Sequence, residues 1–411
     1  MANVLKVTDL VAKEALRIAH EKLQFIGTAD RQFDAEFKMN GRGSPHGSSL
    51  RVKDPNQYIR RVGNAMVVQE QNESTQTITV ATLNGVDMNF TMQELVQSVD
   101  NDGAFDALSK NYIAPAVASL CSGIESDFIA FATKATANLV GTAGTALTDL
   151  VVPGAARARL NQAAAPKDGM RYIQADSVTM GGMVNGLKGL FQDSAQIKEQ
   201  YREGMMGRTA MADWYENDRM WTLPNSADVA GDINAGTLTS GVTNLTVNGL
   251  SVAPVAGMVF TIGVAGTDPV YAVHPETKAA LPHLKQFVCS AGCTITNLVF
   301  TPAVIFSTTD PKQNCSGALV TGADIVFAGS ASTNYVQSLM YHKEAYQFIT
   351  APLPIVDDAH KCVRVEKDGL SLRCWMGSDI RGNELLMRID ILYGMAALRP
   401  EWACRMIGVA G

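Results

Sequence analysis

A long stretch without arginine most constrains how this chain can fold. Between Arg219 and Arg364 there is not one arginine, and residues 226–333 are dominated by Val, Thr, Ala, Gly and Asn. Such an abrupt change in composition indicates a separate unit. Short β-rich runs divided by Gly, Pro and Asn are typical of a barrel or a sandwich. The predicted strands are 243–247, 258–262, 271–273, 285–289, 293–300, 318–320 and 325–327.

The β unit is predicted to be inserted into an α+β host, because helix and strand patterns resume at Tyr335. Residues 385–392 alternate between two sets of positions, one of which is wholly apolar. This alternation is the period of a strand with one apolar face. Arg388 and Asp390 fall on the other face, where they can pair. The turn Arg399-Pro400-Glu401 follows almost at the end of the sequence.

The clearest predicted helix spans residues 106–137. Apolar side chains recur there at steps of three and four residues, while charged side chains occupy other positions. Pro115 interrupts the pattern. The helix therefore either begins near Asn111, with the proline in its first turn, or bends at the proline. Either alternative gives a rod of several turns.

A second, weaker stripe of apolar residues between Leu10 and Leu23 predicts an amphipathic helix capped by Thr8. Such a helix either packs on its own domain, which periodicity alone favours, or docks on a partner.

Residues 38–61 form a basic segment rich in glycine, serine and proline, with Asp54 as its lone acid. No packed core can be built from such a composition. An alternating strand at 76–83 follows and ends at Asn84-Gly85, a strong turn signal. The basic segment is a solvated loop, a nucleic-acid arm or an extended loop lying across a neighbouring subunit. The candidate contact residues are Arg42, Arg51, Lys53, Arg60 and Arg61.

Composition sets broader limits. A chain of 411 residues with 46% hydrophobic side chains is expected to form two or more compact units. Its net charge of −6 and charged fraction of 18% argue against holding polyanions by bulk electrostatics. No leader pattern and no run of 18 uncharged apolar residues is visible, so neither export nor membrane insertion is predicted. Seven scattered cysteines predict reduced thiols in a cytoplasmic folding compartment.

Catalytic and metal-binding motifs have little support in the sequence. His283, Cys289, Cys293 and Cys315 are residue types that zinc accepts, but their spacing is loose, and buried small thiols are the commoner outcome. No metal site and no cofactor are predicted. The glycine-rich string at 181–188 lacks the lysine and hydroxyl register of a phosphate loop. No HExxH pair, nucleophile elbow or kinase loop occurs, so no enzyme activity is predicted.

Three segments resemble one protein family. The helical run FDALSKNYIAPAVASLCSGIESDFIAF looks like the spine helix of the major capsid proteins of tailed double-stranded DNA phages. Residues 165–221, with EQYREGMMGR and DWY, resemble their axial domain, and residues 385–408 resemble their closing segment. The inserted β unit resembles the coat-protein group of that family. The resemblance implies an α+β fold of the Hong Kong 97 type with an inserted, barrel-like β domain.

The resemblance also implies an order of parts along the chain. The expected parts are an N-terminal arm (1–37), an extended loop (38–78), a peripheral domain with the spine helix (79–145), the first part of an axial domain (146–225), the inserted β domain (226–334), the second axial part (335–380) and a return to the peripheral domain (381–411). In this family the basic loop lies over an adjacent subunit, which favours the third interpretation of residues 38–61.

The implied function is mechanical. Copies would form the hexamers and pentamers of an icosahedral head that holds double-stranded DNA without sequence-specific binding. The implied partners are further copies, a separate scaffolding protein, a portal protein and, in some relatives, a decoration protein. Assembly in the bacterial cytoplasm and residence in the virion follow. Lys38, Lys53 and Asn383 are the residue types of the family's covalent cross-link, but no cross-link is predicted. The alternative is the shell of a cellular nanocompartment with the same fold.

Overall fold

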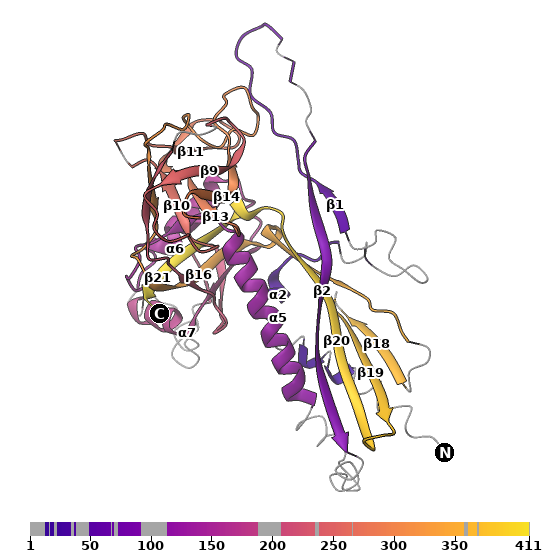
Figure 1. Ribbon diagram of the computed structural model, residues 1–411. Helices are drawn as coiled ribbons and strands as arrows, with labels where there is room; N and C mark the ends of the chain where they lie inside the picture. The colour runs from indigo at the N-terminus through magenta and orange to yellow at the C-terminus, as the bar shows by residue number, and fades with distance from the viewer. Residues whose placement is uncertain are drawn as a thin grey trace. The chain divides into compact units, whose positions relative to one another are not determined.

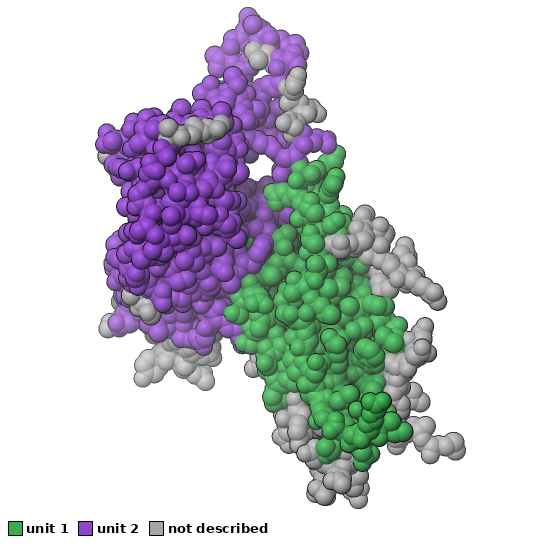
Figure 2. All heavy atoms as spheres, in the orientation of Figure 1, with its two compact units in different colours: residues 1–53, 75–128, 346–396 green, residues 54–74, 129–345, 397–411 purple. Residues whose placement is uncertain are grey.

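The computed structural model describes residues 13–15, 17–19, 23–33, 37, 49–66, 68–69, 73–91, 113–187, 207–234, 238–264, 266–356, 361–367 and 370–410. The chain divides into two compact units, coloured separately in Figure 2. Unit 1 contains residues 1–53, 75–128 and 346–396, and unit 2 contains residues 54–74, 129–345 and 397–411.

Unit 1 is built on a six-stranded sheet. Its main path runs β1 (Ser49–Lys53), β2 (Thr75–Thr91), β20 (Glu384–Ala397), β19 (Leu370–Asp379) and β18 (Lys361–Lys367), and β17 (Tyr346–Ala351) also pairs with β20. The long strands β2 and β20 run antiparallel side by side (Figure 1). Met387, Ile389 and Ile391 of β20 are buried, as the alternating pattern predicted, and the strand continues six residues past Ile391 to Ala397.

The predicted turn at Asn84-Gly85 is wrong, because β2 runs straight through both residues. Gly85 lies opposite Asp390, and a Cβ atom placed on it would come within 2.5 Å of Asp390 Oδ1. The Asn84 amide donates a hydrogen bond to Tyr393 Oη at 2.8 Å. Glycine in a strand often marks a close approach of neighbouring groups rather than a turn.

The predicted pairing of Arg388 with Asp390 is confirmed, with 2.6 Å between Arg388 Nε and Asp390 Oδ1. A second arginine also holds this carboxylate. Arg373, opposite Asp390 on β19, donates from Nη2 to Oδ2 at 2.7 Å. Asp390 is fully buried, so the two charge-assisted bonds replace the water that it has lost.

The long helix α5 (Ala114–Ala135) matches the predicted rod, with Pro115 in its first turn. A proline is tolerated there because the first helical N–H groups have no intrahelical acceptor. The ring of Phe128 lies 4.7 Å from that of Phe25, in α2 (Phe25–Thr28), and 5.4 Å from that of Phe348. α5 is long and apolar enough to pass a test for membrane spans, which the core helix of a soluble protein also passes.

The first part of unit 2 is a closed six-stranded barrel of the order β10-β13-β14-β9-β8-β15. Its strands are β8 (Ala230–Ile233), β9 (Val242–Asn248), β10 (Val259–Ile262), β13 (Gln286–Cys289), β14 (Asn297–Val304) and β15 (Asp324–Phe327). A two-stranded ribbon, β11 (Tyr271–Val273) and β12 (Ala280–Leu284), accompanies it. The predicted strand at 318–320 does not form, and the one predicted at 293–300 begins at Asn297, because a hairpin turn occupies the preceding residues.

The second part of unit 2 is a seven-stranded sheet. Its main path runs β3 (Leu139–Val140), β21 (Ala403–Ala410), β16 (Asn334–His342), β4 (Arg171–Ala175), β6 (Ala212–Glu216) and β5 (Arg208–Thr209). β7 (Thr222–Pro224) also pairs with β16, and the unit contains the helices α6 (Val151–Gln162) and α7 (Ser177–Leu187).

Barrel and sheet form one compact unit, although the composition indicated a separate β unit. Arg405 of β21 is fully buried and donates to the carbonyl oxygens of Thr136 and Gly257 and to Gln337 Oε1. Gln286 of the barrel exchanges two hydrogen bonds with the backbone of Leu139, at 2.8 and 2.9 Å. These bonds fasten the insert to its host, because each leaves a buried polar group unsatisfied if the two parts separate.

The chain passes from one unit to the other after residues 53, 74, 128, 345 and 396. Residues 346–396 all lie in unit 1. The segment 381–411 is divided, with β20 in unit 1 and β21 in the sheet of unit 2. The reason is strand pairing, since β19 forms a hairpin with β20 while β21 pairs with β16.

Candidate assembly interface

The described part of the basic segment, residues 49–61, forms strand β1 and the first half of a β-hairpin loop, and residues 38–48 lie outside the described residues. β1 and β2 pair from Ser49 with Thr79 to Lys53 with Thr75. Residues 54–74 form the loop, and its ends are joined by Asp54 N–H donating to Ser74 O at 2.9 Å and by Ser74 Oγ donating to Asp54 Oδ2 at 2.8 Å. Inside the loop, the Gln69 side chain accepts from Ile59 N–H and donates to Ile59 O. The loop is therefore closed by its own hydrogen bonds.

The predicted contact residues are spread along this hairpin. Arg51 and Lys53 are exposed residues of β1, and Arg60 and Arg61 are exposed in the loop. Arg61 Nη1 donates to Asn64 O at 2.7 Å, which turns its guanidinium back along the loop. Arg42 lies outside the described residues.

The tip of the loop also exposes apolar side chains, which the prediction of contact residues from charge did not include. Val62 is 85% exposed, Met66 82% and Val68 75%, and Tyr58 is also exposed. Three valines and a methionine within residues 62–68 were visible in the sequence as a signal. A group of exposed large apolar residues beside cations is a candidate interaction surface.

The base of the loop is held by two lysines of unit 2. Lys312 Nζ donates to Ser74 Oγ at 2.5 Å, and Lys278 Nζ donates to Gln57 Oε1 at 3.3 Å and to Pro311 O. Burial lowers the pKa of Lys278. The loop is thus anchored near its base, while its apolar tip stays exposed.

The four candidate metal ligands are not assembled. Among the described residues no group of three or more His, Cys, Asp or Glu side chains is placed to hold a metal ion. Cys289 and Cys315 are buried in the barrel core. Cys293 Sγ donates to Val299 O at 3.2 Å, and a hydrogen bond from Cys289 lowers the pKa of Cys293 to about 7. His283 lines a separate cavity.

A histidine and a carboxylate do meet in unit 2, but the pair is structural. His342 Nε2 lies 3.1 Å from Asp168 Oδ1, its Nδ1 accepts from Glu344 N–H, and its ring packs edge-on against Trp402. His342 is fully buried, and a general base must reach the proton it removes.

Comparison with known proteins assigns the C-terminal part of the chain. The family model of the P22 coat protein, gene protein 5, matches residues 235–410, which begin inside the barrel and end with β21. No curated protein matches the chain in sequence.

Among solved structures, one from Mycobacterium phage Che8 overlaps at a TM-score of 0.47, with 10% identity, covering 93% of this chain and 90% of that one. The mature capsid of bacteriophage PhiM1 overlaps at a TM-score of 0.42, with 10% identity, covering 92% of this chain and 87% of that one. A virus-like particle from Pyrococcus furiosus overlaps at a TM-score of 0.35, with 8% identity, covering 97% of this chain and 98% of that one. The family match and the closed barrel inserted in an α+β host agree with each other: over residues 235–410 this chain is similar to the P22 coat protein.

Proposed function

We propose that copies of this chain assemble into the hexamers and pentamers of an icosahedral head around double-stranded DNA, with the loop of residues 54–74 bound to an adjacent copy. The observation that carries the proposal is the exposed tip, where Val62, Met66 and Val68 stand beside Arg60 and Arg61. Burying each of these apolar side chains fully would contribute roughly 1.5–3 kcal/mol. Such contacts would be repeated at every copy around a closed shell.

The arginines would give the contact its direction. Charged groups at the edge of an interface fix register and raise association rates more than they add affinity. The mild net charge of −6 suits a shell whose DNA must move past it, because weak attraction leaves the DNA mobile.

The remaining partners follow from the same role. The protein would need a separate scaffolding protein and a portal protein, and would accept a decoration protein on the finished shell. It would assemble in the host cytoplasm and work without a cofactor or catalytic activity. We expect no covalent link through Lys53 or Asn383, so boiled and denatured particles should give a single monomer band. The family match of residues 235–410 counts against the nanocompartment alternative, for which packaged protein rather than DNA would be required.

Electron microscopy of the purified protein, alone and with its scaffolding protein, tests the proposal. Closed shells are the expected result, and a persistent monodisperse monomer would contradict it. The loop is tested by Arg60→Glu/Arg61→Glu and by Val62→Asp/Met66→Asp, which should reduce particle yield strongly while leaving the thermal midpoint of the monomer in place. The matched control is Lys167→Glu/Lys343→Glu, an equal charge change elsewhere in unit 2. Normal yield from both loop variants would show that the loop is merely solvated.

A further inference from the structure

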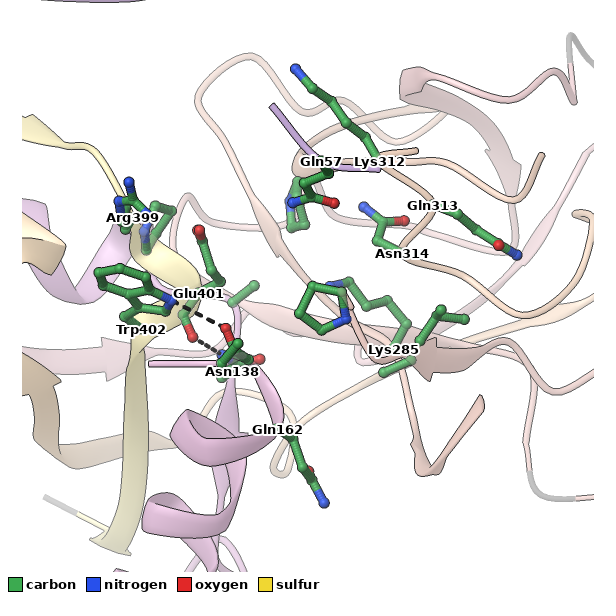
Figure 3. Close-up of a pocket in the computed structure, with 18 of the residues that line it drawn as sticks. Gln57, Asn138, Gln162, Lys285, Lys312, Gln313, Asn314, Arg399, Glu401 and Trp402 are labelled. Atoms are coloured by element: carbon green, nitrogen blue, oxygen red, sulfur yellow. Dashed lines mark hydrogen bonds between the residues drawn. The ribbon is translucent and has the colours of Figure 1, made fainter. Parts of the chain in front are cut away.

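A cavity of about 630 Å³ lies within unit 2, at the base of the loop of residues 54–74. Its wall combines residues 55–58 of the loop, the C-terminal turn of α6, the β11–β14 part of the insert and η4 (Pro400–Trp402) (Figure 3). The wall is well supported. Trp402 Nε1 donates to Ala163 O at 3.1 Å, and Asn138 Nδ2 donates to Glu401 O at 3.2 Å. A volume of this size accommodates a small organic ligand.

Cations outnumber acids on the cavity wall. Arg159, Lys285, Lys312 and Arg399 line it, against the two acids Glu276 and Glu401. The whole chain carries a net charge of −6, so this local excess of cations runs against the general balance. Two of the four already have neighbours: Lys312 bonds to Ser74 Oγ, and Arg399 stacks 4.2 Å from the ring of Trp402. The other two are less well compensated.

Lys285 and Arg159 are half-buried cations that form no ion pair in the described part of the chain. No carboxylate lies within 4.0 Å of either side chain in the described part of the chain. The Nη1 atom of Arg159 is buried and has no hydrogen-bond partner, and the same holds for the neighbouring Gln162 Oε1 on α6. Burial lowers the pKa of both Lys285 and Arg159, because the surroundings penalise their charged forms.

Glu401 is exposed and attracts Lys285 electrostatically, but it forms no ion pair with Lys285 or Arg159 within 4.0 Å. Desolvation by the surrounding atoms raises the pKa of the Glu401 carboxyl, which weakens its negative charge. Buried charges are normally paired, and unpaired ones are costly. An anion entering the cavity would supply the missing charge.

We infer that this cavity binds a small oxyanion, of the inorganic phosphate or polycarboxylate class, through Lys285 and Arg159. A guanidinium fork and an ammonium together are the groups that proteins use for phosphate and carboxylate oxygens. Asn138 and Gln162 add amide groups to the same wall. A divalent cation is not favoured, since no three metal-ligating side chains are grouped among the described residues.

The inference is tested on the full-length, unassembled protein, so its outcome is independent of shell formation. The thermal midpoint is measured against rising inorganic phosphate and, separately, citrate, with sodium chloride adjusted to hold ionic strength constant. Binding to the folded state raises the midpoint in a saturable way. Saturation with phosphate or with citrate supports the site and identifies which oxyanion class it prefers. No rise with either anion overturns the inference.

Two variants locate the site. Lys285→Met and Arg159→Gln should each weaken anion binding by about tenfold or more, the loss expected when a hydrogen bond to a charged group is removed. Lys167→Met, an exposed lysine of unit 2 outside the cavity, is the matched control and should bind as the parent does. If one cavity variant fails to fold, the other still decides. Phosphorus NMR line broadening of phosphate by the parent protein gives a reading that needs no variant, and its absence together with no rise of the midpoint in citrate contradicts the inference.

Discussion

The barrel and the six-stranded sheet of unit 1 solve the problem of a stable β core in different ways. The barrel closes on itself and fills its interior with apolar side chains, with Phe260 lying 5.5–5.6 Å from the rings of Phe287, Phe300 and Phe327. The sheet ends in edge strands and buries a carboxylate, Asp390, between two arginines.

The difference between barrel and sheet shows which interactions fix the strand alignment in each. Closing a barrel removes its edges, so packing alone defines the fold. An open sheet with long strands can slip in register, and a slip of one residue would turn every side chain to the opposite face. The Arg373–Asp390 bond would be lost in any other register, so it ties β19 and β20 to one alignment, whereas Arg388 and Asp390 share β20 and pair in any register.

The largest expected effect is in the barrel. Phe260→Ala should destabilise the protein by about 3–5 kcal/mol, because it leaves a cavity at the centre of the aromatic cluster. Urea unfolding and hydrogen exchange of the β10 and β13 amides measure this. The control is Val326→Ala on β15, where the side chain is partly exposed. Equal losses in the two variants would show that the phenylalanine cluster does not hold the barrel together.

A smaller loss of unfolding free energy is expected when the cluster of Arg373, Asp390 and Arg388 is broken. Asp390→Asn keeps the shape of the side chain but removes its charge, and should cost about 1.5–3 kcal/mol. Asp390→Leu/Arg373→Met replaces the pair by apolar groups and should recover much of the loss of Asp390→Leu alone. Urea midpoints of the three variants check this. A double variant no better than the single one would mean that the ion pair itself, and not the cost of an orphaned charge, determines stability.

Gly85→Ala tests how closely β2 and β20 must approach. The new Cβ would lie 2.5 Å from Asp390 Oδ1 and 2.8 Å from Ile389 O, so one strand must shift, at a cost of about 1–3 kcal/mol. Gly123→Ala in α5 is the control, because no atom lies within 4 Å of its Cβ and alanine favours a helix by about 0.5–1 kcal/mol. The thermal midpoint should therefore fall for the first variant and rise for the second.

The smallest expected effect is a pH dependence in the sheet. Burial, with Asp127 adding to it, raises the pKa of Tyr393 to about 12. The folded state therefore holds this proton more tightly than the unfolded state, so the stabilisation is complete below the pKa of an unfolded tyrosine and is lost as pH rises through about 12. Tyr393→Phe should flatten the decline in unfolding free energy above about pH 10. Identical pH profiles for parent and variant would contradict this.

Much of the local structure was predictable because it depends on short-range patterns. The alternation of residues 385–392 predicted β20 and its pairing of Arg388 with Asp390, and Pro115 sits in the first turn of α5, one of the two predicted positions. The turn predicted at Asn84-Gly85 was wrong because an Asn-Gly pair occurs both in turns and where two strands approach closely. Arg373 was not recognised as the second partner of Asp390, since only strand register brings it opposite that residue.

The sequence by itself determined the class of the protein: an α+β host with an inserted β unit, a long helix, a basic loop and the resemblance to phage capsid proteins. The host, the insert, the helix and the basic loop follow from composition and periodicity, whereas the resemblance rests on the quoted segments at 165–221 and 385–408 and on the helical run. The tertiary structure alone decided that the barrel and the seven-stranded sheet form one unit, fastened by Arg405 and Gln286. It also placed Lys285 and Arg159 on one cavity wall. Such partnerships join residues more than a hundred positions apart, and no local pattern records them.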